Sequence, residues 1–420
     1  MAMDFISSKN IFLLTRDTLK LIDKRLMKHG SRTGYILYKV LQCEDKYEQF
    51  ELADFVMLAT LHDIGAYKTE DISDMLRFEA RDYMPHSIYG YLFMKYLSPM
   101  KELSKVLLYH HSDYYQIKNI PYQYRDIACY LNLAEKIDIY YNALGSRFDF
   151  GMFSKYAGTK YSEEAVKLFS QAQLKYDILS ELKKESYEQE LDELMDYIMF
   201  TNEDKKSFME MLMYCLGFRS EYKVIDSVTT TCICELLAER MGLEEDKKVK
   251  LYYGALLHDI GMLPIPKDMI EAKRALTENE LLQMQKHVKI AEKILSNRMN
   301  QEVVEIACRH HERLNGSGYP RGLKDAQMTE SDKILQVADT ITGLVNKRAY
   351  KESANKEQVL EILQKEVDNK HFDMRIVDLM ILNYDEIMKE VAERSSQILT
   401  MHSKLQVQFE QVHARFHKKE

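Results

Sequence analysis

The 420-residue sequence lacks several features that would indicate particular classes of protein. Its six cysteines show no CxxC spacing, so we expect reduced core thiols and neither a disulfide framework nor a thiolate metal site. The 58 basic residues form no block and stand against 66 acidic ones, which argues against a DNA or RNA partner. The apolar run near the amino terminus is too short for a signal peptide or a membrane span, so a cytoplasmic protein without a membrane segment is expected.

Proline is scarce as well, with six residues, whereas Leu, Met, Glu, Lys and Ala abound and apolar residues recur every three or four positions. This pattern predicts an all-α protein. One helix begins with a capping box formed by Thr277 and Glu280, and its apolar stripe includes His287. A lone histidine there would be an ordinary hydrogen-bonded core residue, but His287 belongs to a larger pattern.

The stretch LHDIG occurs twice, beginning at residues 61 and 257, and other metal-competent side chains follow in the same order each time. The offset between the copies grows from 196 residues at His62 and His258 to 204 at Glu135 and Asp339, because loops rich in Pro and Gly lengthen the second copy. The first copy contains His29, His62, Asp63, His86, His110, His111, Glu135 and Asp138. The second copy contains Asp226, His258, Asp259, His287, His310, His311 and Asp339.

Such a set favours metal-assisted hydrolysis. A carboxylate such as Asp259 has two oxygens and can bridge two divalent ions, while imidazoles from other helices fill the remaining positions. Paired ions lower the pKa of water and stabilise the charge that develops on a phosphoryl group. Nitrogen and oxygen ligands without thiolate favour iron or manganese over a structural zinc site, with zinc or nickel as alternatives, and we expect two divalent ions per active site.

The stretches LLHDIG, HHERLNGSGYPRG and VADT resemble the HD-GYP subclass of HD-domain metal-dependent phosphohydrolases, over about residues 206 to 385. The resemblance implies a phosphodiesterase that hydrolyses the bacterial second messenger cyclic di-GMP to pGpG or GMP, and therefore a role in signal transduction. It assigns the seven metal ligands of the second copy, with His258 and Asp259 at the catalytic centre. The GYP loop follows two of the ligands directly, so we expect it to shape the mouth of the site and contact substrate; alone, it would be an ordinary surface turn. The expected substrate-binding residues are Arg313, Gly318, Tyr319, Pro320 and Arg321.

Several positions depart from the family pattern. Met262 stands where the family has a lysine after HDIG, Asp226 replaces the first histidine, and Thr342 replaces a second aspartate after VAD. The first copy resembles the wider HD superfamily, because it keeps His29 and Asp138 but lacks the GYP loop. Two alternatives to the cyclic di-GMP hydrolase therefore stay open: a sensor or interaction module that binds metal or a cyclic dinucleotide without turnover, and an HD phosphohydrolase that acts on another nucleotide.

The organisation predicted from these patterns is two tandem HD-type helical domains, at residues 1–145 and 206–385. Residues 146–205 are charged and amphipathic and are expected to form a helical connector. Residues 386–420 carry a weak heptad and are expected to form a terminal helix, which either makes a coiled-coil contact in a homodimer or lies back on the body of the protein.

Overall fold

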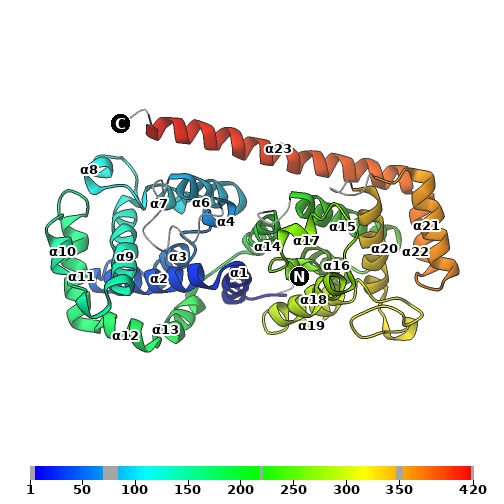
Figure 1. The fold of residues 1–420 in the computed structure, drawn as a ribbon, viewed down its shortest axis with the longest axis horizontal. Coiled ribbons are helices and arrows are strands. Elements are labelled where there is room, and N and C mark those ends of the chain that lie inside the picture. The colour runs from blue at the N-terminus through cyan, green and yellow to red at the C-terminus, as the bar shows by residue number, and fades with distance from the viewer. Residues whose placement is uncertain (1–4, 70–83, 218–220, 347–352, 418–420) are drawn as a thin grey trace. The chain divides into compact units, whose positions relative to one another are not determined.

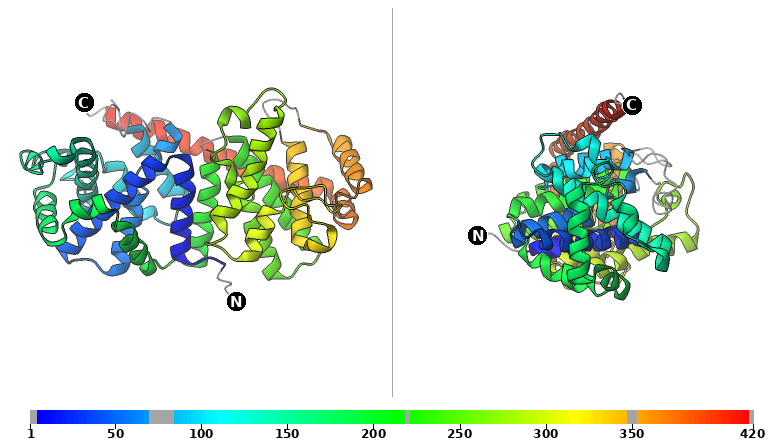
Figure 2. Two further views of the ribbon diagram at one scale, coloured as in Figure 1. Left: turned by 60° about the horizontal axis from the view of Figure 1, so that its bottom comes forward. Right: turned by 90° about the vertical axis from the view of Figure 1, so that its left-hand side faces the viewer.

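The computed structural model describes residues 5–69, 84–217, 221–346 and 353–417. These residues form α-helices, short 3₁₀-helices and two isolated β-bridges, without a strand, so the protein is all-α as predicted (Figures 1 and 2). Within these ranges no helix has both the length and the apolar character that a membrane crossing requires. The chain divides into two compact units. The N-terminal unit comprises Ser8–Phe208 and Leu405–Glu420, and the C-terminal unit comprises Met1–Ser7 and Met209–Lys404.

The N-terminal unit is built around α2 (Lys24–Glu44), which packs against α3 (Gln49–Thr60), α9 (Arg125–Leu144) and α11 (Glu163–Tyr176). The side chain of Asp23 caps the first turn of α2 by accepting from two main-chain N–H groups. The other helices are α1 (Ser8–Ile22), α4 (Ala66–Thr69), α6 (Met84–Leu97), η1 (Lys101–Leu103), α7 (Ser104–Tyr109), α8 (Tyr114–Ile117), η2 (Gly145–Arg147), α10 (Gly151–Ser154), α12 (Ile178–Lys184), α13 (Tyr187–Leu194) and η3 (Met195–Tyr197).

The predicted connector at residues 146–205 is instead part of the N-terminal unit. Its helix α11 buries Val166 and Phe169, and α13 buries Tyr187, whose ring lies 5.6 Å from the ring of Tyr35 on α2. The apolar side of this segment thus covers α2, and its many charges mark only the solvent side. The change from one unit to the other falls within α14 (Asn202–Leu216), between Phe208 and Met209.

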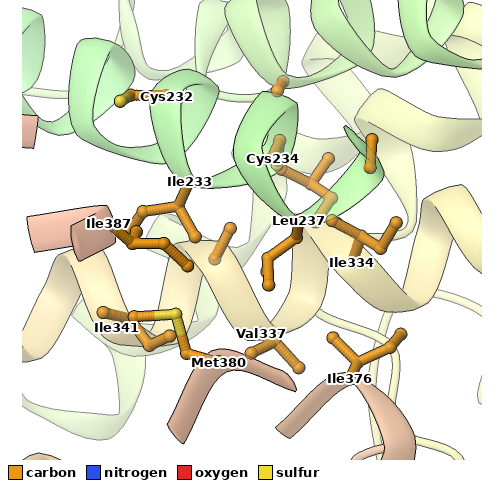
Figure 3. Packing of buried hydrophobic residues seen from close by; sticks show 14 of the residues in the cluster. Cys232, Ile233, Cys234, Leu237, Ile334, Val337, Ile341, Ile376, Met380 and Ile387 are labelled. Atoms are coloured by element: carbon orange, nitrogen blue, oxygen red, sulfur yellow. The ribbon is translucent and has the colours of Figure 1, made fainter. Parts of the chain in front are cut away.

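The C-terminal unit is centred on α15 (Glu221–Arg240), which packs against α16 (Glu245–Leu257) and α20 (Glu330–Val345). Figure 3 shows part of the core of this unit, to which Leu237 of α15, Val337 and Ile341 of α20 and Met380 of α22 (Met374–Leu382) belong. The remaining helices are η4 (Ile260–Met262), α17 (Lys267–Ile270), α18 (Glu278–Leu295), α19 (Gln301–Cys308), η5 (Asp325–Gln327), α21 (Lys356–Asp368), α22 (Met374–Leu382) and α23 (Tyr384–His417).

The terminal helix α23 is continuous over 34 residues, as Figure 1 shows. Val391 near its start belongs to the core of the C-terminal unit. From Leu405 onward it belongs to the N-terminal unit, where Phe409 stacks on Tyr89 with ring centroids 4.4 Å apart. Val391 and Phe409, two apolar residues of α23, therefore contact the body of the same chain. The alternative, a coiled-coil contact in a homodimer, stays a prediction.

Candidate metal centres

Each LHDIG stretch ends a helix and places its His–Asp pair against the helix that carries the next histidine. In the C-terminal unit α16 ends at Leu257, and a Cβ atom on Gly261 would lie 2.0 Å from the main-chain oxygen of His287 on α18. In the N-terminal unit a Cβ atom on Gly65 would lie at the same 2.0 Å from the main-chain oxygen of His86. Only glycine permits such an approach of two main chains, so this residue brings the pair and the next histidine together.

In the C-terminal unit the predicted ligands converge on Asp259. One carboxylate oxygen, Oδ2, lies 3.6 Å from Nε2 of His258, and the other, Oδ1, lies 3.6 Å from Nε2 of His287. Nε2 of His310 is 3.1 Å from that of His287. Asp339 is the last member of the group. Its carboxylate lies 3.7 Å from Nε2 of His258 and 3.7 Å from Nδ1 of His311. The structure therefore brings six of the seven predicted ligands together.

The imidazoles of this group are held in one orientation by the main chain. Nδ1 of His258, His287 and His310 each lies 2.7 Å from the carbonyl oxygen three residues earlier. When Nδ1 donates to that oxygen, the lone pair of Nε2 faces the centre of the group, which is the arrangement that a metal ligand requires. Nε2 of His258 is buried and has no hydrogen-bond partner.

The buried charges of the group shift its pKa values in opposite directions. Burial would lower the pKa of His258, but the carboxylates of Asp259 and Asp339 outweigh this effect and raise it to about 9. Burial and the neighbouring imidazoles hold the pKa of His310 well below its ordinary value. The pKa of Asp259 is lowered despite burial, because Lys223 and the surrounding histidines stabilise the carboxylate.

Asp226, the seventh predicted ligand, is engaged by other groups of the chain. It accepts a hydrogen bond of 2.9 Å from Nδ2 of Asn346 and lies 3.8 Å from Nζ of Lys223. Lys223 also donates a hydrogen bond of 2.8 Å to Oδ2 of Asp259. Sequence reasoning did not single out Lys223; the one signal was its place three residues before Asp226, on the same face of α15.

A cavity of about 640 Å³ opens onto this group and is lined by Asp259, His287, His311 and Asp339 together with residues of α17 and α18. Met262 lines an apolar wall of the cavity with Met269. The cations that line the cavity, among the residues that the structure describes, are Lys223 and Arg274.

The GYP loop is fixed by Glu312, whose buried carboxylate accepts hydrogen bonds from the main-chain N–H groups of Arg321 at 2.7 Å and Leu323 at 2.8 Å. A Cβ atom on Gly318 would lie 2.5 Å from the main chain of Glu312, so this glycine allows the loop to fold back. Tyr319 packs over His311, with ring centroids 4.7 Å apart, and lines the cavity.

The other predicted substrate-binding residues do not line this cavity. The guanidinium of Arg313 lies over the ring of Phe372, and that of Arg321 is paired with Glu292. Gly318 and Pro320 shape the loop around Tyr319. Of the five predicted residues, Tyr319 is therefore the one that faces the cavity.

The N-terminal unit contains a similar group around Asp63. Its Oδ2 lies 3.2 Å from Nε2 of His62 and 3.8 Å from Nε2 of His29, and its Oδ1 lies 3.4 Å from Nε2 of His86 and 3.9 Å from Nε2 of His110. The ligand atoms form two compact sets, each within 4.8 Å. One set is Asp63, His86, His110 and His111, and the other is His29, His62 and Glu135.

Two groups beside these sets hold ligands in place. Asp138 pairs with Nδ1 of His29 at 2.8 Å and with the guanidinium of Arg32 at 2.6 Å, so it orients His29 and lies outside both sets. The sequence had placed Asp138 among the ligands. Lys136 donates a 2.9 Å hydrogen bond to Glu135 and lies 3.2 Å from Nδ1 of His111.

The residues of both units fit divalent transition-metal ions. Buried nitrogen and oxygen atoms without a hydrogen-bond partner include Nε2 of His62, Oδ1 of Asp63, Nε2 of His110 and Oε2 of Glu135, and such atoms are costly unless a cation satisfies them. The two groups differ in exposure: the side chain of His311 is 24% exposed and that of its counterpart His111 only 7%.

Comparisons with known proteins agree with this geometry. A family model described as HD domain matches residues 206–376. The 3'3'-cGAMP-specific phosphodiesterase 1 of Vibrio cholerae is 26% identical over 377 residues, which cover 85% of this chain and 87% of that protein. The cyclic di-GMP phosphodiesterase PdeB of Borreliella burgdorferi is 36% identical over 163 residues, 39% of this chain and 43% of that protein.

A crystal structure of the cyclic GMP-AMP specific phosphodiesterase V-cGAP3 of V. cholerae has a similar fold, with a TM-score of 0.56 at 15% identity. The match covers 93% of this chain and 97% of that one. The fold of both units therefore has a counterpart in a solved protein. Residues 206–376 of this chain are therefore similar to the HD-domain family.

Proposed function

We propose that the C-terminal unit is a metal-dependent phosphodiesterase that hydrolyses cyclic di-GMP to pGpG or GMP. The observation that carries this proposal is the convergence of His258, His287, His310 and Asp339 around Asp259. Asp259, His287 and Asp339 also line a cavity of about 640 Å³. A cavity of that size lies in the range of small-molecule sites. Nitrogen and oxygen ligands without thiolate favour iron or manganese.

Different residues of the site would bind metal, line the cavity and contact substrate. His287, His310 and His311 offer imidazole nitrogens on the Oδ1 side of Asp259. His258 and Asp339 lie on the Oδ2 side, where Lys223 also donates a hydrogen bond. Divalent ions, when bound, lower the pKa of water and stabilise negative charge on phosphoryl oxygens. Lys223 and Arg274 line the cavity, where Lys223 is paired with Asp259 and Arg274 with Glu280. Met262 stands where the resemblance implies a lysine. Tyr319 lines the cavity and packs over His311.

The names of the relatives support the class of substrate. Both are phosphodiesterases of cyclic dinucleotides, one named for cyclic di-GMP and one for 3'3'-cGAMP. Because the relative that spans most of this chain is named for 3'3'-cGAMP, both compounds belong in the test.

The test is anaerobic incubation of the full chain, loaded with iron(II) or manganese(II), with each cyclic dinucleotide, followed by chromatography for linear products. The Asp259→Asn variant should lose product formation, whereas Asp63→Asn, the matched change in the N-terminal unit, should retain it. If the wild type forms no product from either compound but binds one of them, the alternative of a sensor without turnover replaces the proposal. If it binds neither, another nucleotide becomes the substrate to seek.

We also propose that the N-terminal unit forms a divergent HD-type domain that holds metal ions of its own, with Asp63 between them. Buried nitrogen and oxygen atoms of His62, Asp63, His110 and Glu135 that make no hydrogen bond support this assignment. Because these side chains are almost fully buried, the ions would stabilise the unit and would not meet substrate. Asp63→Asn should therefore lower the metal content and the unfolding temperature of the protein; an unchanged metal content would contradict the assignment.

A further inference from the structure

The two units share the order of their ligands but differ at one corner of the site. In the N-terminal unit, the carboxylate oxygen of Asp63 that faces His62 also faces Nε2 of His29, at 3.8 Å. In the C-terminal unit, the corresponding oxygen of Asp259 faces the ammonium group of Lys223 at 2.8 Å. An imidazole that could bind a metal has thus been exchanged for a fixed cation.

The ligand sets differ in the same way. In the N-terminal unit, His29, His62 and Glu135 lie within 4.8 Å of one another and form the second of two sets. In the C-terminal unit, the described residues form one such set, His287, His310 and His311. The counterpart of His29 is Asp226, which binds Asn346 and lies 3.8 Å from Lys223.

Electrostatics explains why an ammonium group and a metal ion would exclude each other here. Oδ2 of Asp259 already accepts the hydrogen bond of Lys223, and the side chain of Lys223 is only 12% exposed, so solvent screens its charge weakly. A divalent ion between His258 and Asp339 would lie close to that charge and would compete for the same oxygen.

We infer that Lys223 takes the place of one metal ion, so that the C-terminal unit binds a single divalent ion at His287, His310, His311 and Asp259. The sequence had predicted two ions for this site. The ammonium group neutralises the Oδ2 side of Asp259 permanently, so this half of the site needs no loading with metal. The inference concerns the site of the proposed function and rests on it only in taking Asp259 as a ligand.

The experiment counts metal ions in the full chain. Four proteins are compared: the wild type, Lys223→Met, Lys223→Arg and the control Lys248→Met. Each is stripped of metal with a chelator, reloaded anaerobically with manganese(II), desalted and analysed by mass spectrometry. We expect Lys223→Met to gain about one ion per chain, because the space and the carboxylates of Asp226 and Asp259 become available to a cation. Lys223→Arg and Lys248→Met should keep the wild-type count.

Electron paramagnetic resonance gives a second readout. We expect Lys223→Met to gain the signal of a spin-coupled manganese pair in the C-terminal unit, measured in an Asp63→Asn background that removes the N-terminal pair. Equal counts in wild type and Lys223→Met would overturn the inference, as would a coupled pair in the Asp63→Asn protein that retains Lys223. Neither measurement uses substrate. The proposed hydrolysis can therefore be refuted while this inference holds, and this inference can be refuted while the proposed hydrolysis holds.

Discussion

The carboxylate of Glu312 accepts the main-chain N–H of Arg321 at 2.7 Å across nine residues, and so ties the far end of the GYP loop to the residue that follows the His–His pair. The same carboxylate binds the N–H of Leu323, and the main-chain oxygen of Glu312 accepts a hydrogen bond from Gln336 on α20. The loop therefore depends on one buried acid, and this explains why the acid directly follows the two histidines.

Replacing Glu312 with Gln should loosen the loop. The amide offers one acceptor where the carboxylate offered two and places an N–H₂ group against a main-chain donor, at a cost of about 1–3 kcal/mol. We expect faster limited proteolysis within residues 313–327 and a lower kcat/KM, because Tyr319 loses its support. Glu302→Gln, an exposed change on α19, is the control. Equal proteolysis rates in the two variants would refute the role of Glu312.

Tyr319 and Arg321 should differ sharply in their effect on substrate binding. Tyr319→Ala removes a ring that covers His311 and lines the cavity, so KM should rise about tenfold or more. Arg321→Met should change KM by less than about threefold, because its guanidinium is paired with Glu292 outside the cavity. Steady-state kinetics of the two variants checks both values. A larger effect at Arg321 would restore the role that the sequence had given it.

The glycine of the first LHDIG stretch should be irreplaceable. In Gly65→Ala the new Cβ atom would lie 2.0 Å from the main-chain oxygen of His86, so α6 must move; we expect a loss of about 3 kcal/mol or more in the free energy of unfolding. Gly90→Ala is the matched control, because its Cβ atom would meet its nearest neighbours at 3.4 Å, an ordinary contact. Chemical denaturation should show the large loss in the first variant alone.

Asp54 should make the N-terminal unit less stable as the pH rises. Burial, together with the charges of Glu51 and Asp204, raises the pKa of Asp54 to about 6. An acid whose pKa is raised on folding binds its proton more tightly in the folded state, so stability falls between about pH 4 and pH 6 and stays lower above. Asp54→Asn removes this penalty, which is on the order of 1 kcal/mol for a partly exposed group.

Thermal unfolding at about pH 4.5 and pH 8 checks this expectation. The unfolding temperature of the Asp54→Asn variant should exceed that of the wild type by a few degrees at pH 8. At pH 4.5 the two temperatures should differ little. The same change at the exposed Asp368 is the control. A difference that does not vary with pH would mean that Asp54 keeps an ordinary pKa in the folded protein.

The positions of the metal-competent residues could be predicted from the sequence because their order repeats and because helix periodicity turns His287 toward the interior. The predicted helix with its capping box at Thr277 and Glu280 is present as α18. The family resemblance over the second copy is confirmed by the match to the HD domain at residues 206–376.

Side-chain partners could not be predicted in the same way. Arg313 and Arg321 flank the GYP motif, but their guanidinium groups bind Phe372 and Glu292, which lie far away in the sequence. Lys223 looks in the sequence like any charged residue on a helix, and only the folded chain places it beside Asp259. The segment at residues 146–205 carries enough charge to resemble a connector, while its apolar side chains cover α2.

The contact of main chain with main chain at Gly65 and Gly261 has a consequence for the choice of metal. Side chains can rotate to accommodate a larger ion. The distance between two main chains that are already in contact, however, cannot be adjusted in this way. Each His–Asp pair and the histidine of the next helix are thereby held at a fixed separation, so the sites should discriminate by ionic radius. Under the proposed metal binding, we therefore expect manganese(II) or iron(II) to bind in preference to calcium, which forms longer bonds and has a higher coordination number.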